Sequence, residues 1–208
     1  MRTKQRILQE ALRLFSQKGY DAVSVEQIAD AVGIKAPSLY KHYKGKRDIF
    51  DAIFEETAKR YDAFTDTISV HMQDAEQDRQ TFQSITAEEL VRKVQSLVSY
   101  SLHDELVSQF RRMMTIEQFR SPELSSLYSQ RYVEQIQQYH QALFRRLIEA
   151  GVLRDEDPAI LAMVYDAPIL LWLGECDRHP EKEPEAMIML ENHVRLFYQM
   201  FGRHPHAE

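Results

Sequence analysis

Residues 24–43 constrain the fold most, because they specify a helix, a tight turn and a second helix within twenty residues. Ser24 and Gln27 form a capping box, which predicts the start of the first of these helices. Gly33 supplies the backbone freedom that a sharp turn needs. Pro37 is tolerated in the first turn of the second helix, where its missing N–H costs little. The stretch therefore predicts a helix-turn-helix, whose second helix enters the DNA major groove.

A further helix is predicted before this motif, over residues 3–18. Its apolar residues recur at helical spacing, and Gly19 follows as a C-cap. Leu39 is expected to face inward from the second helix of the motif, and Tyr43 to turn back to the core. Residues 1–46 are thus predicted to form a three-helix head.

The outward-facing residues of the head are donors suited to DNA. Those able to reach base edges or phosphates are Lys35, Ser38 and Lys41. Those suited to phosphate oxygens are Tyr40 and His42.

Two further candidates flank the predicted groove. Ser24 is expected to hold the DNA backbone on one side, although its role as a helix cap is an alternative use. Lys46 combines a side-chain charge with the free N–H groups of a helix start, which is an anion-binding arrangement. We expect both residues to contact phosphates.

The net charge of the whole chain, −6, hides an uneven distribution. Residues 1–50 carry ten Lys or Arg against five Asp or Glu, whereas the remainder carries 16 against 27. A basic head on an acidic body is typical of a DNA-binding module attached to a part that stays off DNA. The alternative is an ordinary three-helix domain with solvated lysines.

Several function classes lack their sequence patterns. No Gly-rich phosphate loop, nucleophile elbow or metal-ligand spacing is present, so we expect no enzyme, cofactor or metal site. A single cysteine, Cys176, excludes an internal disulfide and fits a reducing cytoplasm. No stretch approaches about 18 consecutive apolar residues, and the start of the chain does not resemble a signal peptide, so no membrane segment is expected.

Residues 47–208 predict a second, helical domain. We expect a loop or a frayed helix end at the polar stretch 71–85 and a charged loop at 177–185. Helices predicted over 158–173 and 185–201 are apolar on most sides, and burying them in a body this small requires a partner subunit. The alternative is a core within one chain. Helix starts are predicted from cap residues at Thr86, Asp104, Ser121 and Asp157.

The middle of this second domain contains a candidate ligand pocket, because Met and aromatic residues recur there at helical spacing. Such side chains form an adaptable apolar surface with polar handles, although they are core residues more often than pocket residues. Asp166, two residues before Pro168, is expected to cap a kink, pair with an Arg across a dimer or face a cationic ligand. The candidate lining residues are Tyr100, His103, Phe110, Met113, Met114, Glu117, Tyr128, Tyr132, Tyr139 and Trp172.

Residues 3–50 resemble the DNA-binding head of the tetracycline-repressor (TetR) family. Departures from the family pattern are mild: Ser24 and Tyr43 stand where Thr and Phe are common. Lys35, Ala36 and Pro37 stand where Ser and Gly are frequent, so the DNA-reading surface is particular to this chain. The matching elements are Ala11-x-x-Leu14-Phe15-x-x-x-Gly19-Tyr20, Ser24-Val25-x-x-Ile28-Ala29-x-x-Val32-Gly33-Ile34 and Leu39-Tyr40-x-His42-Tyr43-x-x-Lys46.

This resemblance implies an all-α protein of about nine helices, with a ligand-binding and dimerisation domain over residues 47–208. It also implies a ligand-responsive regulator, usually a repressor, that dimerises through its last two helices. We therefore expect a cytoplasmic homodimer that binds a palindromic operator in double-stranded DNA and is released by a small-molecule effector. Two alternatives are a ligand-independent architectural DNA-binding protein and a helical protein whose head no longer binds DNA.

Overall fold

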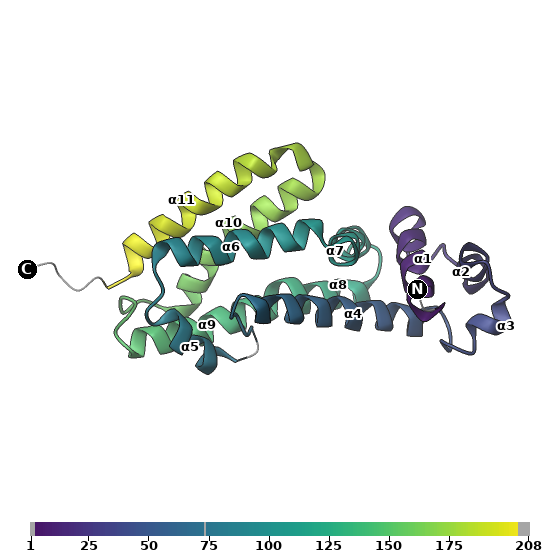
Figure 1. Cartoon of the computed structure of the whole chain (residues 1–208), viewed down its shortest axis with the longest axis horizontal. Coiled ribbons are helices and arrows are strands. Elements are labelled where there is room, and N and C mark those ends of the chain that lie inside the picture. The colour runs from purple at the N-terminus through teal and green to yellow at the C-terminus, as the bar shows by residue number, and fades with distance from the viewer. Residues whose placement is uncertain (1–2, 73, 204–208) are drawn as a thin grey trace, which may run out of the picture. The chain divides into compact units, whose positions relative to one another are not determined.

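The computed structural model of the chain describes residues 3–72 and 74–203. Within these ranges it is built from helices, as the sequence predicts, and its extended structure is limited to one antiparallel bridge between Leu153 and Gly202 (Figure 1). The helices are α1 (Thr3–Lys18), α2 (Val25–Val32), α3 (Ala36–Leu39), α4 (Lys46–Thr67), α5 (Ala75–Phe82), α6 (Ala87–His103), α7 (Glu105–Glu117), α8 (Pro122–Ser129), the π-helix η1 (Gln130–Glu134), α9 (Gln135–Glu149), α10 (Pro158–Arg178), the 3-10 helix η2 (Pro180–Lys182) and α11 (Glu183–Phe201).

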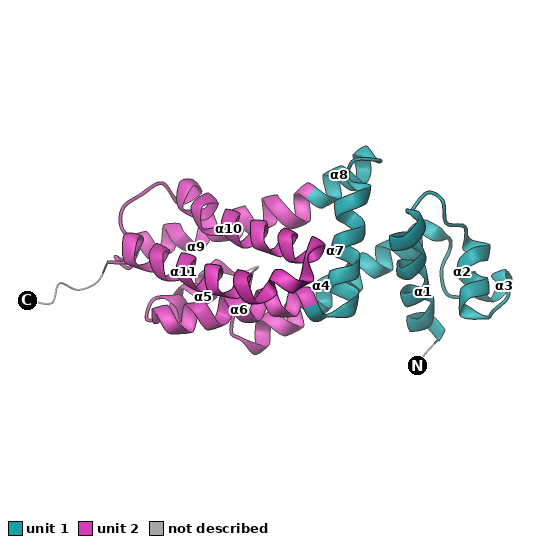
Figure 2. Cartoon of the chain, turned by 90° about the horizontal axis from the view of Figure 1, so that it is seen from above, with its two compact units in different colours: residues 1–61, 103–128 teal, residues 62–102, 129–208 magenta. Residues whose placement is uncertain are grey.

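The chain divides into two compact units, shown in different colours in Figure 2. Unit 1 comprises the described residues of 1–61 and 103–128, and so contains α1 to α3, most of α4, α7 and most of α8. Unit 2 comprises the described residues of 62–102 and 129–208, with α5, most of α6 and α9 to α11. The helix-turn-helix thus shares a unit with α7, which lies far from it in sequence.

The core of unit 1 is built from the apolar stripe of α1 and a chain of aromatic rings. The ring centroids of Tyr20 and Phe50 lie 5.2 Å apart, and those of Phe50 and Phe110 lie 5.7 Å apart. Phe54 adds an edge-on contact with Phe110 at 6.0 Å. The buried residues of α1 are Ile7, Ala11, Leu12, Leu14 and Phe15, the stripe that helical periodicity predicts.

Short-range capping signals fix several helix ends as predicted. Ser24 and Gln27 form the full reciprocal capping box at the start of α2. Gly33 ends that helix with φ 75°, in the left-handed region that favours glycine. Side-chain caps also begin α6, α7, α8 and α10, at Thr86, Asp104, Ser121 and Asp157.

Unit 2 surrounds a second apolar core. Within it the rings of Phe144, Tyr165 and Phe197 pack edge-on or tilted, with centroids 5.0–5.6 Å apart. The end of α11 is tied to the α9–α10 connection, because Arg154 N donates to Phe201 O at 2.8 Å. The buried residues are Leu90, Val91, Val94, Tyr139, Leu143, Phe144, Leu147, Leu153, Leu161, Ala162, Tyr165, Val194 and Phe197.

Two predicted loops are wrong in part. The stretch 71–85 contains α5, whose N-cap is Asp74: its carboxylate accepts from the backbone N–H groups of residues 76 and 77. The fully buried residue of α5 is Asp78, so a carboxylate lies between Ala75 and Phe82 on the inward face and interrupts the apolar pattern. The stretch 177–185 is also largely helical: α10 runs to Arg178, and α11 begins at Glu183.

Candidate DNA-binding surface

The turn between α2 and α3 is held by backbone hydrogen bonds. Gly33 N–H donates to the carbonyls of Ala29 and Asp30, and Ile34 N donates to Ala29 O at 3.0 Å. Lys35 then precedes α3 in an extended conformation, with φ −78° and ψ 145°, and makes no side-chain cap hydrogen bond. The Lys35 side chain therefore does not cap α3.

The short helix α3 has one buried side and one outward side. Leu39 is fully buried, and Tyr43, just beyond the helix, is 5% exposed, so both point to the core as predicted. Burial also raises the pKa of the Tyr43 phenol. The outward residues are Lys35, Pro37, Tyr40, Lys41 and His42, which are exposed, and Ala36 and Ser38, which are half-buried.

Lys46 is engaged within the protein. Its Nζ donates to Tyr20 O at 2.8 Å and to Asp21 O at 3.1 Å, and it lies 4.5 Å from the centroid of the Tyr20 ring. The α1–α2 connection is therefore clamped to the start of α4. Ser24 is exposed, and its hydroxyl accepts from Gln27 N at 3.3 Å, so it serves as the predicted cap. A phosphate contact by either residue remains a prediction.

Two cations of α1 that sequence reasoning missed also support the motif. Arg6 Nη2 donates to Val32 O at 2.7 Å and so satisfies a carbonyl at the end of α2. Lys4 Nζ lies 5.3 Å from the centroid of the Tyr43 ring. Arg6 and Val32 are 26 residues apart, and no short-range pattern signals such a pair.

Six of the candidate ligand residues belong to unit 1. Phe110, Met113 and Met114 are at most 1% exposed and form part of its core. Glu117 is paired with Arg120, at 3.0 Å between Oε1 and Nη1. His103 is exposed and Tyr128 half-buried. A role of these residues in ligand binding remains a prediction.

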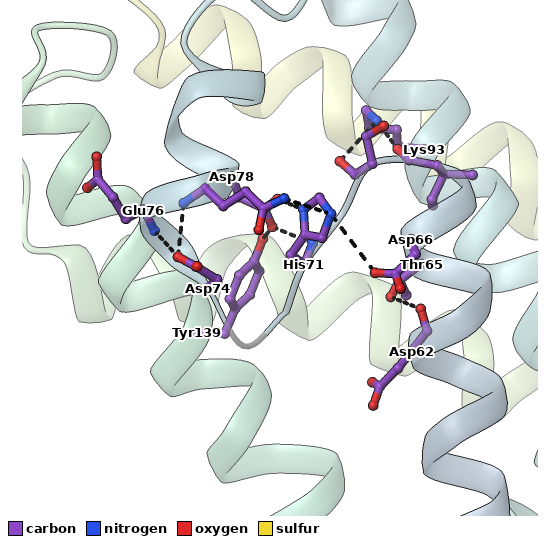
Figure 3. A network of polar contacts seen from close by, with 12 residues as sticks. Asp62, Thr65, Asp66, His71, Asp74, Glu76, Asp78, Lys93 and Tyr139 are labelled. Atoms are coloured by element: carbon purple, nitrogen blue, oxygen red, sulfur yellow. Dashed lines mark hydrogen bonds and ion pairs between the residues drawn. The ribbon is translucent and has the colours of Figure 1, made fainter.

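The other four candidates, Tyr100, Tyr132, Tyr139 and Trp172, belong to unit 2. Tyr100 stacks face to face on Phe64, with ring centroids 4.0 Å apart. Tyr139 donates its hydroxyl to the buried Asp78 carboxylate (Figure 3). Tyr132 lies beside the Arg131 guanidinium and, like Trp172, is half-buried.

Asp78 is the centre of a polar network that links α5 to α9 (Figure 3). Besides Tyr139, it accepts from His71 N and from His71 Nδ1, each at 2.8 Å. Three donors on one buried carboxylate offset its desolvation. Tyr139 therefore has a structural use that its aromatic spacing alone does not reveal.

Asp166 makes its contacts within the chain. Gln137 Nε2 of α9 donates to Asp166 Oδ2 at 2.7 Å, and His140 Nδ1 lies 2.7 Å from Asp166 Oδ1. The neighbouring Tyr165 phenol is buried, which raises its pKa well above the ordinary range. This arrangement joins α10 to α9, a use that was not among the three expected for Asp166.

A broad apolar surface remains exposed on α10 and α11. By length and composition alone, α10 is long and apolar enough to cross a membrane. The core helix of a soluble protein passes the same test, and α10 carries the buried Asp166. The exposed large apolar residues of the two helices are Ile160, Met163, Val164, Leu171, Ile188, Met189, Leu196 and Met200.

Two family models match the chain. One, described as "Bacterial regulatory proteins, tetR family", matches residues 7–53. The other, described as "AefR-like transcriptional repressor, C-terminal domain", matches residues 88–169.

Curated relatives resemble the head. The regulator AcrR of Shigella flexneri is 47% identical over 53 residues, which are 26% of this chain and 25% of AcrR. The negative regulator IcaR of Staphylococcus aureus (strain Newman) is 44% identical over 48 residues, 23% of this chain and 26% of IcaR. The chain thus matches about a quarter of the length of these relatives.

Solved structures resemble the whole chain in fold. SmeT, the repressor of the Stenotrophomonas maltophilia efflux pump SmeDEF, superposes with a TM-score of 0.66 at 19% identity, covering 98% of this chain and 92% of SmeT. PfmR of Thermus thermophilus superposes with a TM-score of 0.62 at 24% identity, covering 99% of each chain. At these identities the likeness shows the fold alone.

Proposed function

The chain belongs to the TetR family of transcriptional regulators, and from this we propose that it is a cytoplasmic, ligand-responsive repressor that binds a palindromic operator as a homodimer. The observation that carries the proposal is the outward side of α3, which presents donors at every exposed position except Pro37. Residues 1–46 would bind DNA, and residues 47–208 would bind the effector and dimerise.

The nine proposed DNA-binding residues divide by location. Seven lie on α3 and its flanks, and their outward side chains suit base edges, phosphates and apolar contact with thymine methyl groups. Ser24 and Lys46 lie beside this surface: Ser24 caps α2, and Lys46 would serve DNA binding by holding the loop before α2 in place. The seven are Lys35, Ala36, Pro37, Ser38, Tyr40, Lys41 and His42.

Dimerisation would use the apolar surface of α10 and α11. Eight large apolar side chains exposed on two adjoining helices exceed what isolated surface residues explain, and such a patch marks an interaction site. A second copy of the chain is the natural occupant, because two-fold pairing places two recognition helices on two half-sites about 34–36 Å apart.

Effector binding would act on this spacing. A ligand that favours a conformation with displaced heads weakens operator binding, because only the undisplaced form fits two successive major grooves. One solved structure of similar fold is a SmeT–triclosan complex, with a TM-score of 0.68 to this chain. The proposed lining residues here are the ten Met, aromatic and polar candidates of the second domain.

Operator selection from random duplex DNA at near-physiological salt tests the proposal. We expect enrichment of a palindrome with half-sites about one helical turn apart. Salt-sensitive binding without enrichment would contradict it in favour of an architectural DNA-binding protein. Absence of binding would show that the head does not bind DNA.

A further inference from the structure

One face of α7 is directed at the last turn of α1, and both helices belong to unit 1. Gln109 Nε2 donates to Ser16 Oγ at 3.0 Å. Two turns further along α7, Glu117 reaches the end of α1: a Cβ on Gly19 would lie 3.1 Å from Glu117 Oε1. Residues 109, 113 and 117 follow one another at the four-residue spacing that aligns side chains on a helix.

Glu117 is an unusual residue to place there. Its side chain is 3% exposed, and its ion-pair partner is the Arg120 guanidinium at 3.0 Å. The C-terminal end of a helix carries a partial negative charge, so a carboxylate beside the end of α1 is unfavourable without a cation. Arg120 therefore balances both the buried carboxylate and the helix end.

Gly19 completes the arrangement. It is buried with φ +88°, and a Cβ at this position would lie 2.8 Å from Arg120 Nη1. The absence of a side chain thus leaves room for the guanidinium. A cavity of about 170 Å³ adjoins these groups and is lined by residues 15–19 of the α1 end and by Met113, Ile116, Glu117 and Arg120.

We propose that Glu117 and Arg120 are positioning residues for operator binding, which lock the end of α1 to α7 and thereby hold the helix-turn-helix in its DNA-reading orientation. The inference rests on the proposed function and extends it, since neither residue needs to touch DNA. Arg6 ties the end of α2 to α1, so α2 follows any pivot of α1. Releasing α1 from α7 would misplace both recognition helices of a dimer relative to their half-sites.

If Glu117 and Arg120 position the head, their loss should lower the affinity for operator DNA only. A palindrome demands the register of two heads, whereas non-specific binding depends mainly on the phosphate charge. We expect Arg120→Ala to lower operator affinity at least about tenfold and to change affinity for random DNA by less than about twofold. Arg120→Lys keeps the charge without the planar fork and should restore part of the loss.

Hydrogen exchange of the free protein tests the lock independently of DNA. In Arg120→Ala, backbone amides of residues 16–20 should exchange at least about tenfold faster, with unit 2 unchanged as evidence of folding. The matched control is Arg13→Ala, which breaks the Glu10–Arg13 pair: it has the same three-residue spacing, a distance of 2.8 Å and an arginine that is likewise exposed, but its carboxylate is 32% exposed, whereas that of Glu117 is 3% exposed. This control should change neither the exchange of residues 16–20 nor the affinity for operator DNA.

Each contrary outcome has a distinct meaning. Unchanged exchange in Arg120→Ala would overturn the lock. Faster exchange with an unchanged ratio of operator to random affinity would overturn the positioning role. A wild-type protein that selects no operator would overturn the proposed function and the positioning role with it, whereas the exchange comparison would still report the α1–α7 lock.

Discussion

Lys46→Met tests how this lysine serves DNA binding, because its ammonium can either bind a DNA phosphate or hold the loop before α2. In the structure Nζ donates to Tyr20 O at 2.8 Å and to Asp21 O at 3.1 Å and lies over the Tyr20 ring. Hydrogen bonds from a charged donor contribute about 1.5–3 kcal/mol each when shielded, and partial exposure reduces this. We expect Lys46→Met to lower the free energy of unfolding by about 1–2 kcal/mol in total.

The salt dependence of DNA binding separates the two uses. Each neutralised phosphate contributes about 0.9 to the slope of log K against log salt concentration. Lys35 and Lys41 of the proposed surface, and Lys44 in the turn before α4, are exposed, and their ammonium groups make no ion pair within the described residues. In the proposed dimer, three such lysines in each subunit would give a wild-type slope of about 5 in magnitude.

The two variants should then differ. Lys41→Met, the matched control, removes one exposed cation per subunit and should reduce the slope to about 3.6. Lys46→Met should leave the slope near about 5, because the ammonium that it removes is already held by carbonyls. The operator affinity of Lys46→Met should still fall, because the loop before α2 is no longer held in place.

Fluorescence anisotropy with a labelled operator duplex, titrated at five or more KCl concentrations, measures both slopes. Thermal denaturation of the same samples measures the stability loss. A slope for Lys46→Met as low as that of Lys41→Met, with unchanged thermal stability, would refute the clamp and show that Lys46 contacts phosphate.

Three further predictions concern unit 2. Leu171→Glu should shift sedimentation velocity from dimer to monomer, because it places a charge at a 63% exposed position of the proposed interface; a persistent dimer would contradict the use of this face. Asp78→Asn should lower the free energy of unfolding in urea by about 2–4 kcal/mol, and Tyr139→Phe by about 1–2 kcal/mol. Equal, small losses in the two variants would refute the network. Because burial raises the Tyr165 pKa, the contribution of its neutral phenol to the free energy of unfolding is complete below the unfolded value near about pH 10 and is lost as pH rises further. Tyr165→Phe should therefore gain stability relative to wild type only above about pH 10 in chemical denaturation. Tyr40→Phe, at a 51% exposed position, is the control.

The local architecture of the head was predictable because its signals are short-range. Ser24 and Gln27 are three residues apart and cap one another, and Gly33 adopts the positive φ that its position after α2 requires. Inward residues such as Leu39 follow from periodicity alone. These features depend on neighbours within one or two helical turns, so a single sequence reveals them.

The failures arise where a polar group is buried against a distant partner. The helix α5 was missed because its inward residue is Asp78, whose donors lie 7 and 61 residues away. Glu117 stays a predicted ligand-binding residue, but no sequence pattern indicates that its carboxylate is buried beside Gly19, almost a hundred residues earlier. Hydrophobic periodicity predicts that such a carboxylate is exposed, and only the tertiary structure shows the buried partners that stabilise it.

The charge of the head shows the same limit, because the sequence does not reveal which cations are bound within the protein. The excess of basic residues in the first fifty gives the right sign for a DNA-binding head, but it overstates the charge available to DNA. Arg6 and Lys46 are bound to backbone carbonyls, and Arg13 and Arg47 form ion pairs with carboxylates. Arg6 and Lys46 hold the motif together, and Arg13 and Arg47 are partly neutralised, so the DNA-facing charge is that of the few exposed lysines on and beside α3. A head built this way depends on internal cation contacts for its shape and on a separate set of lysines for its affinity.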